Sequence, residues 1–226
     1  MNLRLAAVIG LSQMCLACVN VVSVDVEDDV SFVDFEASAP LDDSGATRIR
    51  VRSTQVDGDF DQTLDAGEAI LVDNNILFGP TEVTGEMDIN YWSLAIGQDD
   101  RSQAGVAGTM RPVYYFGVSQ TRWDLDVNRA ARGFSTSDET TEIYFQYGFL
   151  YTFRPSLELG FSWATSIGQD VSGINEIDLK MNYAPLENLG VTAGYRWFDY
   201  EYGLGAEESH LEVDFRGPYL GLSLQL

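Results

Sequence analysis

Acidic side chains at short, regular spacing form the first candidate site for chemistry. The segment DGDFDQTLDAGE places carboxylates at positions 1, 3, 5, 9 and 12 of a calcium-binding loop, namely Asp57, Asp59, Asp61, Asp65 and Glu68. Closely spaced oxygen ligands of this kind can surround a divalent cation. Gln62 stands where such a loop needs glycine for its sharp turn, so a solvated acidic loop is the competing interpretation. The segment predicts weak Ca²⁺ binding at most, and we expect no other cofactor.

Nucleophilic catalysis would depend on His210, which is the one histidine of the sequence. It follows Glu207, Glu208 and Ser209, and a Ser/His/acid set can hydrolyse or transfer acyl groups. Ser209 and His210 are adjacent, however, so on a strand their side chains face opposite sides of the sheet. We therefore expect that the protein is not an enzyme. A lipid hydrolase or acyltransferase remains a lesser alternative.

The two cysteines, Cys15 and Cys18, lie in a segment that is typical of an export signal. MNLRLAAVIGLSQMCLAC has a short positive start, an apolar run and a small residue, Ala17, before a cleavage site. The apolar run is too short to span a bilayer as a helix. We predict a signal peptide over residues 1–17. Cleavage would leave Cys18 first, which resembles the lipobox of bacterial lipoproteins and implies lipidation of Cys18. Cleavage without lipidation is the alternative.

The composition excludes one class of partner. The chain has 13 Lys and Arg against 35 Asp and Glu, a formal charge of -22, and Lys180 is its only lysine. Affinity for nucleic acid comes from neutralising phosphates with Lys and Arg, so we expect no nucleic-acid partner. The region 18–45 is acidic and irregular, and we predict an acidic N-terminal tether there, with a strand around residues 30–35 as the alternative.

From residue 46 onward the apolar residues alternate with a period of two, which predicts strands. The clearest run sets Ile143, Phe145, Tyr147, Phe149, Tyr151 and Phe153 on one face. Similar alternation predicts eight strands in all, over residues 46–53, 85–97, 112–127, 143–153, 157–163, 174–183, 190–197 and 210–226.

The connections between the predicted strands differ in length. Long segments, about 56–83, 128–138 and 203–209, contrast with the short turns 154–156 and 184–188. Two connections depart from this contrast: 98–108 is longer than the other turns, and 169–173 is only moderate where a long connection is expected. Long loops at one end and short turns at the other are typical of a bacterial outer-membrane barrel.

The C-terminal segment GPYLGLSLQL resembles the terminal strand of outer-membrane barrels. Its leucines are out of phase with Leu211, Val213 and Phe215, so we expect a bulge near residues 217–218. Residues 46–226 as a whole resemble the small eight-stranded outer-membrane barrels, the OmpA/OmpX-like group. This resemblance implies an all-β, antiparallel up-and-down transmembrane barrel whose interior is filled by side chains, without an open pore.

In such a barrel the charged rows would face the lumen and the apolar rows would face lipid. The predicted lumen residues are Arg48, Arg50, Arg52, Arg122, Asp124, Glu158, Glu176, Asp178, Lys180, Arg196, Glu212, Asp214 and Arg216. Closure would place the first and last predicted strands side by side, so arginines of one could pair with carboxylates of the other. A structural plug of salt bridges is expected, and a narrow ion path is the lesser interpretation.

We therefore expect an outer-membrane protein with a structural or surface-interaction role and acidic extracellular loops. The N-terminal tether would lie in the periplasm. The expected partners are outer-membrane lipid, lipopolysaccharide and the outer-membrane assembly machinery, and the protein would be a monomer. A soluble exported or lipid-anchored barrel that binds an apolar ligand inside remains the alternative, because alternation alone does not say which face points inward.

Overall fold

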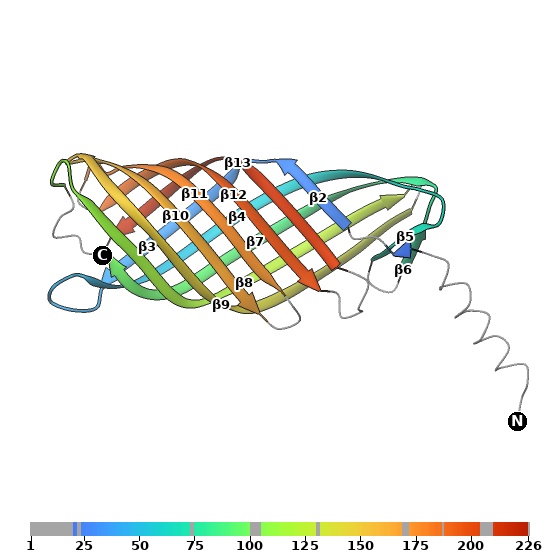
Figure 1. Ribbon diagram of the computed structural model, residues 1–226, viewed down its shortest axis with the longest axis horizontal. Helices are drawn as coiled ribbons and strands as arrows, with labels where there is room; N and C mark the ends of the chain where they lie inside the picture. The colour runs from blue at the N-terminus through green and yellow to red at the C-terminus, as the bar shows by residue number, and fades with distance from the viewer. Residues whose placement is uncertain are drawn as a thin grey trace, which may run out of the picture.

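The computed structural model describes residues 20–21, 24–72, 75–99, 105–129, 132–168, 172–186, 188–203 and 210–225. These residues form an all-β closed barrel (Figure 1). In the part of the chain that the structure describes, no helix is long and apolar enough to cross a membrane. The predicted signal peptide, residues 1–17, and Cys18 lie outside the described residues.

Ten strands build the barrel wall. They are β2 (Val24–Asp29), β3 (Phe32–Pro40), β4 (Thr47–Leu64), β7 (Thr81–Asp99), β8 (Met110–Arg129), β9 (Arg132–Arg154), β10 (Leu157–Gly168), β11 (Gly173–Tyr183), β12 (Leu189–Gly203) and β13 (His210–Gln225). A small separate sheet consists of β1 (Asn20–Val21), β5 (Glu68–Val72) and β6 (Asn75–Phe78). Ile70 and Leu77 of this sheet are buried in the same cluster as Leu64 and Val83 of the barrel, so the sheet covers one end of the barrel interior.

The ten strands occupy nine positions around the barrel, which we call staves. β2 and β3 lie end to end and form one stave, and both pair in parallel with β13. Their pairings keep one register, from Leu211 opposite Val24 to Gln225 opposite Ser38. All other neighbours in the wall are antiparallel. An up-and-down barrel with an odd number of staves must close through one parallel pair, since its first and last staves run in the same direction.

The prediction of eight strands was therefore wrong by one stave. The additional stave, β2 with β3, comes from the segment 18–45, which was predicted to be a tether. Its alternation is short but regular: Phe32 and Asp34 are largely buried, whereas Val33 and Phe35 are exposed. The predicted contact between the first and last of the eight strands is also absent, because β3 lies between β4 and β13.

The strands are longer than their apolar patterns predicted. The predicted loop 56–83 continues β4 as far as Leu64 and contains the start of β7 at Thr81. The predicted loop 128–138 belongs mostly to β9, which begins at Arg132. The sequence pattern did not predict these extensions because their outward residues are acidic or polar. A segment with that composition resembles a loop as long as its partner strand is unknown.

No bulge interrupts β13. Its pairing with β12 keeps one register from Gly203 opposite His210 to Leu189 opposite Leu224, so the expected bulge at residues 217–218 was wrong. Gly217 has another role there: a Cβ on this residue would lie 1.7 Å from the carbonyl oxygen of Val30. The neighbouring Pro218 has no backbone N–H to donate, and the ladder with the N-terminal stave is interrupted at this point, between β2 and β3.

The two ends of the barrel differ. The connections β3–β4, β9–β10 and β11–β12 and the end of β13 lie at one end, which we call the turn end (left in Figure 1). The start of β2, the β8–β9 hairpin and the small sheet lie at the other end, which we call the collar end (right in Figure 1). The wall therefore begins at one end of the barrel and finishes at the opposite end.

Candidate functional site

An apolar belt surrounds the half of the barrel nearer the turn end. Its members point outward and are more than a third exposed. They are Phe35, Val51, Trp92, Leu94, Ile96, Tyr114, Phe116, Val118, Ile143, Phe145, Tyr147, Phe149, Tyr151, Phe153, Leu159, Trp163, Ile177, Leu179, Met181, Tyr183, Val191, Tyr195, Trp197, Leu220 and Leu222. Exposed apolar patches on soluble monomers are usually much smaller than a complete belt of this kind.

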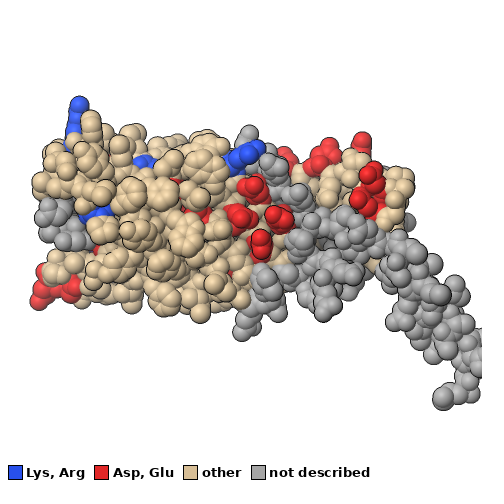
Figure 2. All heavy atoms as spheres, in the orientation of Figure 1, with Lys and Arg blue, Asp and Glu red and all other residues tan. Residues whose placement is uncertain are grey.

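An acidic collar replaces the belt in the other half. Its outward members are Asp57, Asp59, Asp61, Glu82, Glu86, Asp88, Asp124, Asp126, Asp199, Glu201, Glu212 and Asp214. Figure 2 shows the change on one face: the left part of the described surface is mostly uncharged apart from the turn end, and acidic side chains gather toward the right.

The inward residues change in the opposite way, from charged near the turn end to apolar near the collar end. On β4 the inward residues Arg48, Arg50 and Arg52 near the turn end are followed by Val56, Phe60 and Leu64 toward the collar end. On β13 the inward residues Leu211, Val213 and Phe215 of the collar half are followed by Gly217, Tyr219 and Gly221. The period of two is unbroken along both of these strands, so the barrel has a charged interior inside the belt and an apolar interior inside the collar.

Five charged side chains form an ion-pair layer across the interior: Asp34, Arg52, Glu176, Asp178 and Arg196. Arg196 is fully buried and donates from Nη1 to Asp34 Oδ1 at 2.8 Å and from Nη2 to Asp34 Oδ2 at 2.5 Å. Its Nε lies 3.5 Å from Glu176 Oε1, which also accepts from Arg52 Nη1 at 2.8 Å. Buried charges of this kind are tolerated when they are paired and hydrogen-bonded.

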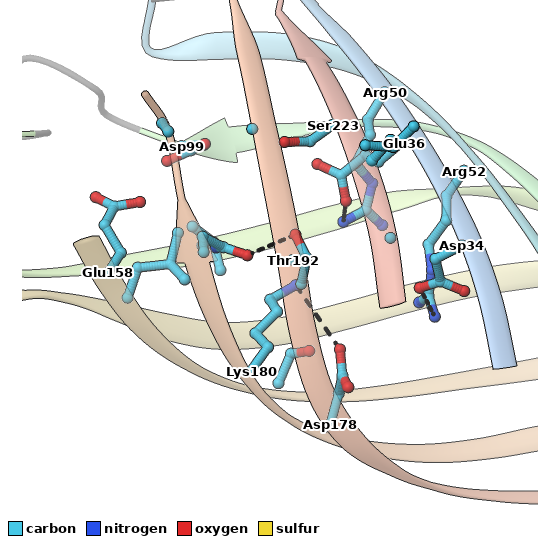
Figure 3. A pocket seen from close by; sticks show the side chains of 18 of the residues that line it. Asp34, Glu36, Arg50, Arg52, Asp99, Glu158, Asp178, Lys180, Thr192 and Ser223 are labelled. Atoms are coloured by element: carbon cyan, nitrogen blue, oxygen red, sulfur yellow. Dashed lines mark hydrogen bonds and ion pairs between the residues drawn. The ribbon is translucent and has the colours of Figure 1, made fainter. Parts of the chain in front are cut away.

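Lys180 completes the charge balance of this layer. Its Nζ lies 3.8 Å from Asp178 Oδ2. A dashed line marks this ion pair in Figure 3. Arg52, Arg196 and Lys180 then face Asp34, Glu176 and Asp178, which is three positive charges against three negative ones. The N-terminal stave, through Asp34, supplies one of the three carboxylates.

A second set of ion pairs lies nearer the turn end. Arg111 Nη2 donates to both carboxylate oxygens of Glu158, at 2.9 and 2.8 Å, and its Nη1 contacts Asp99. The guanidinium carbon of Arg50 lies 3.9 Å from the centre of the Tyr115 ring, and Arg50 Nη2 donates to the Tyr144 hydroxyl at 2.9 Å. Glu36 on β3 lies 3.9 Å from Arg50.

An aromatic plug lies next to the ion-pair layer on its collar side. It consists of Phe32, Tyr91, Tyr144 and Phe198, each at most 1% exposed. Their ring centres are 6.3 Å apart for Phe32 and Phe198 and 6.4 Å apart for both Tyr91 contacts, with tilted or edge-on rings. Four large rings at one level fill the cross-section of a small barrel.

Seven of the residues predicted in the lumen line the interior: Arg48, Arg50, Arg52, Glu176, Asp178, Lys180 and Arg196. Glu158 lies there too. The other five are on the outer wall, and this is a correction: Arg122, Asp124, Glu212, Asp214 and Arg216. They belong to the collar half, where the inward residues are apolar. The prediction assumed that the charged row faces inward along the whole length of each strand. Arg122 pairs with Asp124 at 3.4 Å on this surface.

The prediction also missed interior groups. They are Asp34, Glu36, Asp99, Arg111 and Glu142. Asp34 and Glu36 were assigned to the tether, although each alternates with an apolar neighbour, Val33 or Phe35. Glu142 alternates with Ile143 in the clearest predicted strand, so its position was available from the sequence.

The residues of the predicted calcium loop do not form one loop. Asp57, Asp59 and Asp61 point outward from the extended strand β4, Asp65 lies in the turn after it, and Glu68 begins β5. Glu68 Oε2 instead accepts a hydrogen bond from the backbone N–H of Asp65 at 2.8 Å. Among the described residues, no group of three or more His, Cys, Asp and Glu side chains is arranged to hold a metal ion.

His210 starts β13 at the collar end, opposite Gly203. Its side chain and residues 207–209 lie outside the described part of the structure.

Like charges meet within the collar. Asp88 lies opposite Asp57 on one neighbouring strand and opposite Asp124 on the other. The pKa of Asp88 is raised, first by partial desolvation and then by its hydrogen bond with Asp57 and the charges of Asp57, Asp124 and Glu86. The pKa of Asp199 is raised as well, by desolvation and by the nearby Glu201, Asp214 and Glu212.

A cavity of about 470 Å³, which we call the vestibule, lies inside the belt half. Its walls carry Arg50, Arg52, Asp178 and Lys180, and Pro155 and Pro185 of the turns line its outer part (Figure 3 shows its charged wall). The ion-pair layer forms its inner end, so the described interior is a pocket that opens at the turn end.

No family model matches this sequence, and no curated protein or solved structure is significantly similar to it.

Proposed function

We propose that this protein is an integral β-barrel of a bacterial outer membrane, with a structural or surface-interaction role and without enzymatic activity. One observation carries the proposal: halfway along the barrel, the apolar side chains change from the outer face of the wall to its inner face. The belt half has an apolar outside and a paired ionic inside, as a barrel in lipid requires. The collar half has an acidic outside and an apolar inside, as a barrel in water requires.

The height of the belt supports this proposal. On β9 it extends from Ile143 to Phe153. Ten residue steps of about 3.4 Å give about 34 Å along the strand. With the usual tilt of about 40°, this is a belt about 25 Å tall, the height of the apolar band in outer-membrane barrels.

Aromatic residues lie at both borders of the belt. Trp92, Trp163 and Trp197 lie next to the polar residues with which the collar half begins. Tyr151 and Tyr183 lie near the turn end. Amphipathic rings favour the interface between hydrocarbon and water, so two aromatic borders support a membrane position for the surface between them.

A closed interior accords with a structural role. The ion-pair layer and the aromatic plug lie across the barrel axis between the vestibule and the collar half. The partners that we propose are outer-membrane lipid, lipopolysaccharide and the outer-membrane assembly machinery.

The topology supports one orientation. Outer-membrane barrels keep their short turns on the periplasmic side. The belt reaches nearly to the turn end, whereas the collar extends the wall well beyond it, as long extracellular segments do, so the turn end would face the periplasm and the collar would face outward. The N-terminal stave would then enter the barrel from the outer side, because β2 starts at the collar end. The expected periplasmic N-terminal tether is incompatible with this orientation in a nine-stave barrel.

Membrane fractionation combined with gel mobility tests the proposal. We expect the native protein to sediment with outer membranes, to require detergent for extraction and to migrate differently before and after boiling. A water-soluble monomer with the same mobility in both states would contradict the proposal and favour a soluble barrel.

A further inference from the structure

The vestibule owes its space to small inward residues on β10, β12 and β13. Gly160, Gly190, Gly221 and Ser162 line or adjoin it where the collar half carries large apolar side chains. A Cβ on Gly160 would lie 2.7 Å from Leu150 Cδ2 and 3.0 Å from Lys180 Cγ. Glycine at this position therefore keeps room for the stem of Lys180.

Lys180 reaches the vestibule with hydrogen-bonding capacity to spare. An ammonium group has three N–H donors. Within the described part of the chain, its recorded polar partner is Asp178 Oδ2 at 3.8 Å, which exceeds hydrogen-bond range. The side chain is 17% exposed, so its charge is largely withdrawn from bulk water but still reachable through the vestibule.

Other donors in the vestibule wall are also without a hydrogen-bond partner among the described residues. They are Arg50 Nε and Ser162 Oγ, on residues that are at most 3% exposed; Arg52 Nη2 makes no hydrogen bond either, but it lies 3.4 Å from Asp34 Oδ2. One acceptor of the wall, Asp178 Oδ1, is likewise without a hydrogen-bond partner among the described residues.

The carboxylates of the wall are engaged with their neighbours. Asp34 accepts two hydrogen bonds from Arg196 and one from Thr54, and Glu158 accepts from Arg111 and Thr152. Asp178 accepts from the Tyr219 hydroxyl at 3.0 Å and lies 3.7 Å from Arg196. Asp178 would therefore stay compensated if Lys180 turned to another acceptor.

We propose that the vestibule binds a small organic carboxylate with an apolar body. The carboxylate accepts hydrogen bonds from the Lys180 ammonium, and the apolar body lies against Val113 and Leu150, which line the same cavity. A charge-assisted hydrogen bond in a site largely shielded from water gives the carboxylate its preference over a neutral or cationic analogue. This inference depends on the barrel interior and holds whether or not the belt lies in a membrane.

Because Lys180 is the only lysine, it can report on its own site. Reductive ¹³C-methylation of the full chain in detergent labels this amine and the chain's α-amino group, and Lys180→Met identifies the resonance that belongs to Lys180. Benzoate is the probe, and benzylamine, with the same ring and the opposite charge, is the matched control. We expect benzoate to shift the Lys180 methyl resonance saturably and benzylamine to leave it unchanged.

Equilibrium dialysis of radiolabelled benzoate against unmethylated protein provides the second measurement. We expect Lys180→Met to weaken binding about tenfold, or about 1.4 kcal/mol. Arg122→Met, which removes a cation from the outer wall, should leave binding unchanged. Absence of saturable benzoate binding, a benzylamine shift as large as that of benzoate, or equal affinity of Lys180→Met and the unsubstituted protein would each overturn the proposal.

Discussion

At the scale of single residues, the interior depends most on Arg196. Its guanidinium is fully buried, donates to Asp34, and lies 4.4 Å from the centre of the Tyr219 ring. It joins Asp34 of the N-terminal stave to β12, although 162 positions separate the two residues in the sequence. Removing one partner of such a pair leaves the other charge buried and uncompensated, which costs much more than the pair itself contributes.

We therefore expect Asp34→Asn to lower the free energy of unfolding by about 3–5 kcal/mol, since Arg196 and Arg52 lose their shared carboxylate. Asp61→Asn, which removes an exposed carboxylate from the collar, is the matched control, and its effect should stay within about 0.5 kcal/mol. Urea unfolding in detergent micelles measures both. Equal effects of the two substitutions would show that the ion-pair layer does not stabilise the fold.

In the acidic collar, removing a carboxylate should raise the free energy of unfolding, whereas removing Asp34 lowers it. The size of this gain should depend on pH. The pKa of Asp88 is raised in the folded protein, so its ionised form opposes folding. The contribution of Asp88 to stability is therefore greatest below the unfolded-state pKa of about 3.9 and falls as the pH rises through the higher folded-state value. Asp88→Asn should raise the free energy of unfolding by about 0.5 kcal/mol at neutral pH, through loss of cross-strand repulsion.

Urea unfolding at several pH values tests this prediction, with Asn90→Ser as an uncharged substitution on the same strand. The gain from Asp88→Asn should disappear below about pH 4, where the native carboxyl is protonated too. A gain that is the same at acidic and neutral pH would assign the effect to something other than charge.

At the scale of elements, the sequence predicts most of the wall but not its closure. Alternation located eight staves, because a period of two is visible wherever one face is apolar. In β13 the apolar residues change from the inner to the outer face at residues 216–219, and the sequence pattern predicted a bulge there. The same pattern results when the register is unchanged and the surroundings of the two faces are exchanged, so the pattern alone does not distinguish the two cases. The stave of β2 and β3 was missed because its carboxylates suggested solvent, whereas they compensate arginines of β4 and β12 that are distant in sequence.

Disulfide trapping distinguishes nine staves from eight. Phe35, Leu222 and Ser53 are exposed on the outer wall, and Phe35 lies opposite both of the others, on β13 and on β4. Neighbouring strands are about 4.8 Å apart, which suits a disulfide. In a background that carries Cys15→Ser and Cys18→Ser, Phe35→Cys with Leu222→Cys should cross-link on oxidation, as a gel-mobility shift shows.

The matched pair for this test is Ser53→Cys with Leu222→Cys. With β3 between them, their Cα atoms are about two strand spacings apart, which is too far for a disulfide. If this second pair cross-links readily and the first does not, the barrel closes with eight staves and the N-terminal stave lies elsewhere.

At the scale of the whole molecule, the barrel consists of two halves that suit different solvents. The apolar interior of the collar half continues into the cover formed by β5 and β6, and the charged interior of the belt half contains the vestibule. The longest strands cross both halves: β7 has 19 residues and β8 has 20, about twice what a bilayer-spanning strand needs.

The proposed orientation predicts which turns are accessible on intact cells. Gly45 lies in the β3–β4 turn at the turn end, and Gly67 lies in the β4–β5 turn at the collar end. Both have positive φ in exposed turns that tolerate insertion. An epitope inserted after Gly67 should bind antibody on intact cells, whereas one inserted after Gly45 should require permeabilised cells. The reverse result would place the collar in the periplasm.

Quenching of tryptophan fluorescence by brominated lipids tests the membrane position of the belt most directly. Trp92, Trp163 and Trp197 are 41, 39 and 39% exposed on the belt, whereas Trp123 is 1% exposed inside the collar half. In variants that retain one tryptophan each, with Phe at the other three positions, the three belt tryptophans should be strongly quenched and Trp123 should be nearly unaffected. Quenching of Trp123 as strong as that of the belt tryptophans, or no quenching at any of the four positions, would contradict insertion of the belt in lipid.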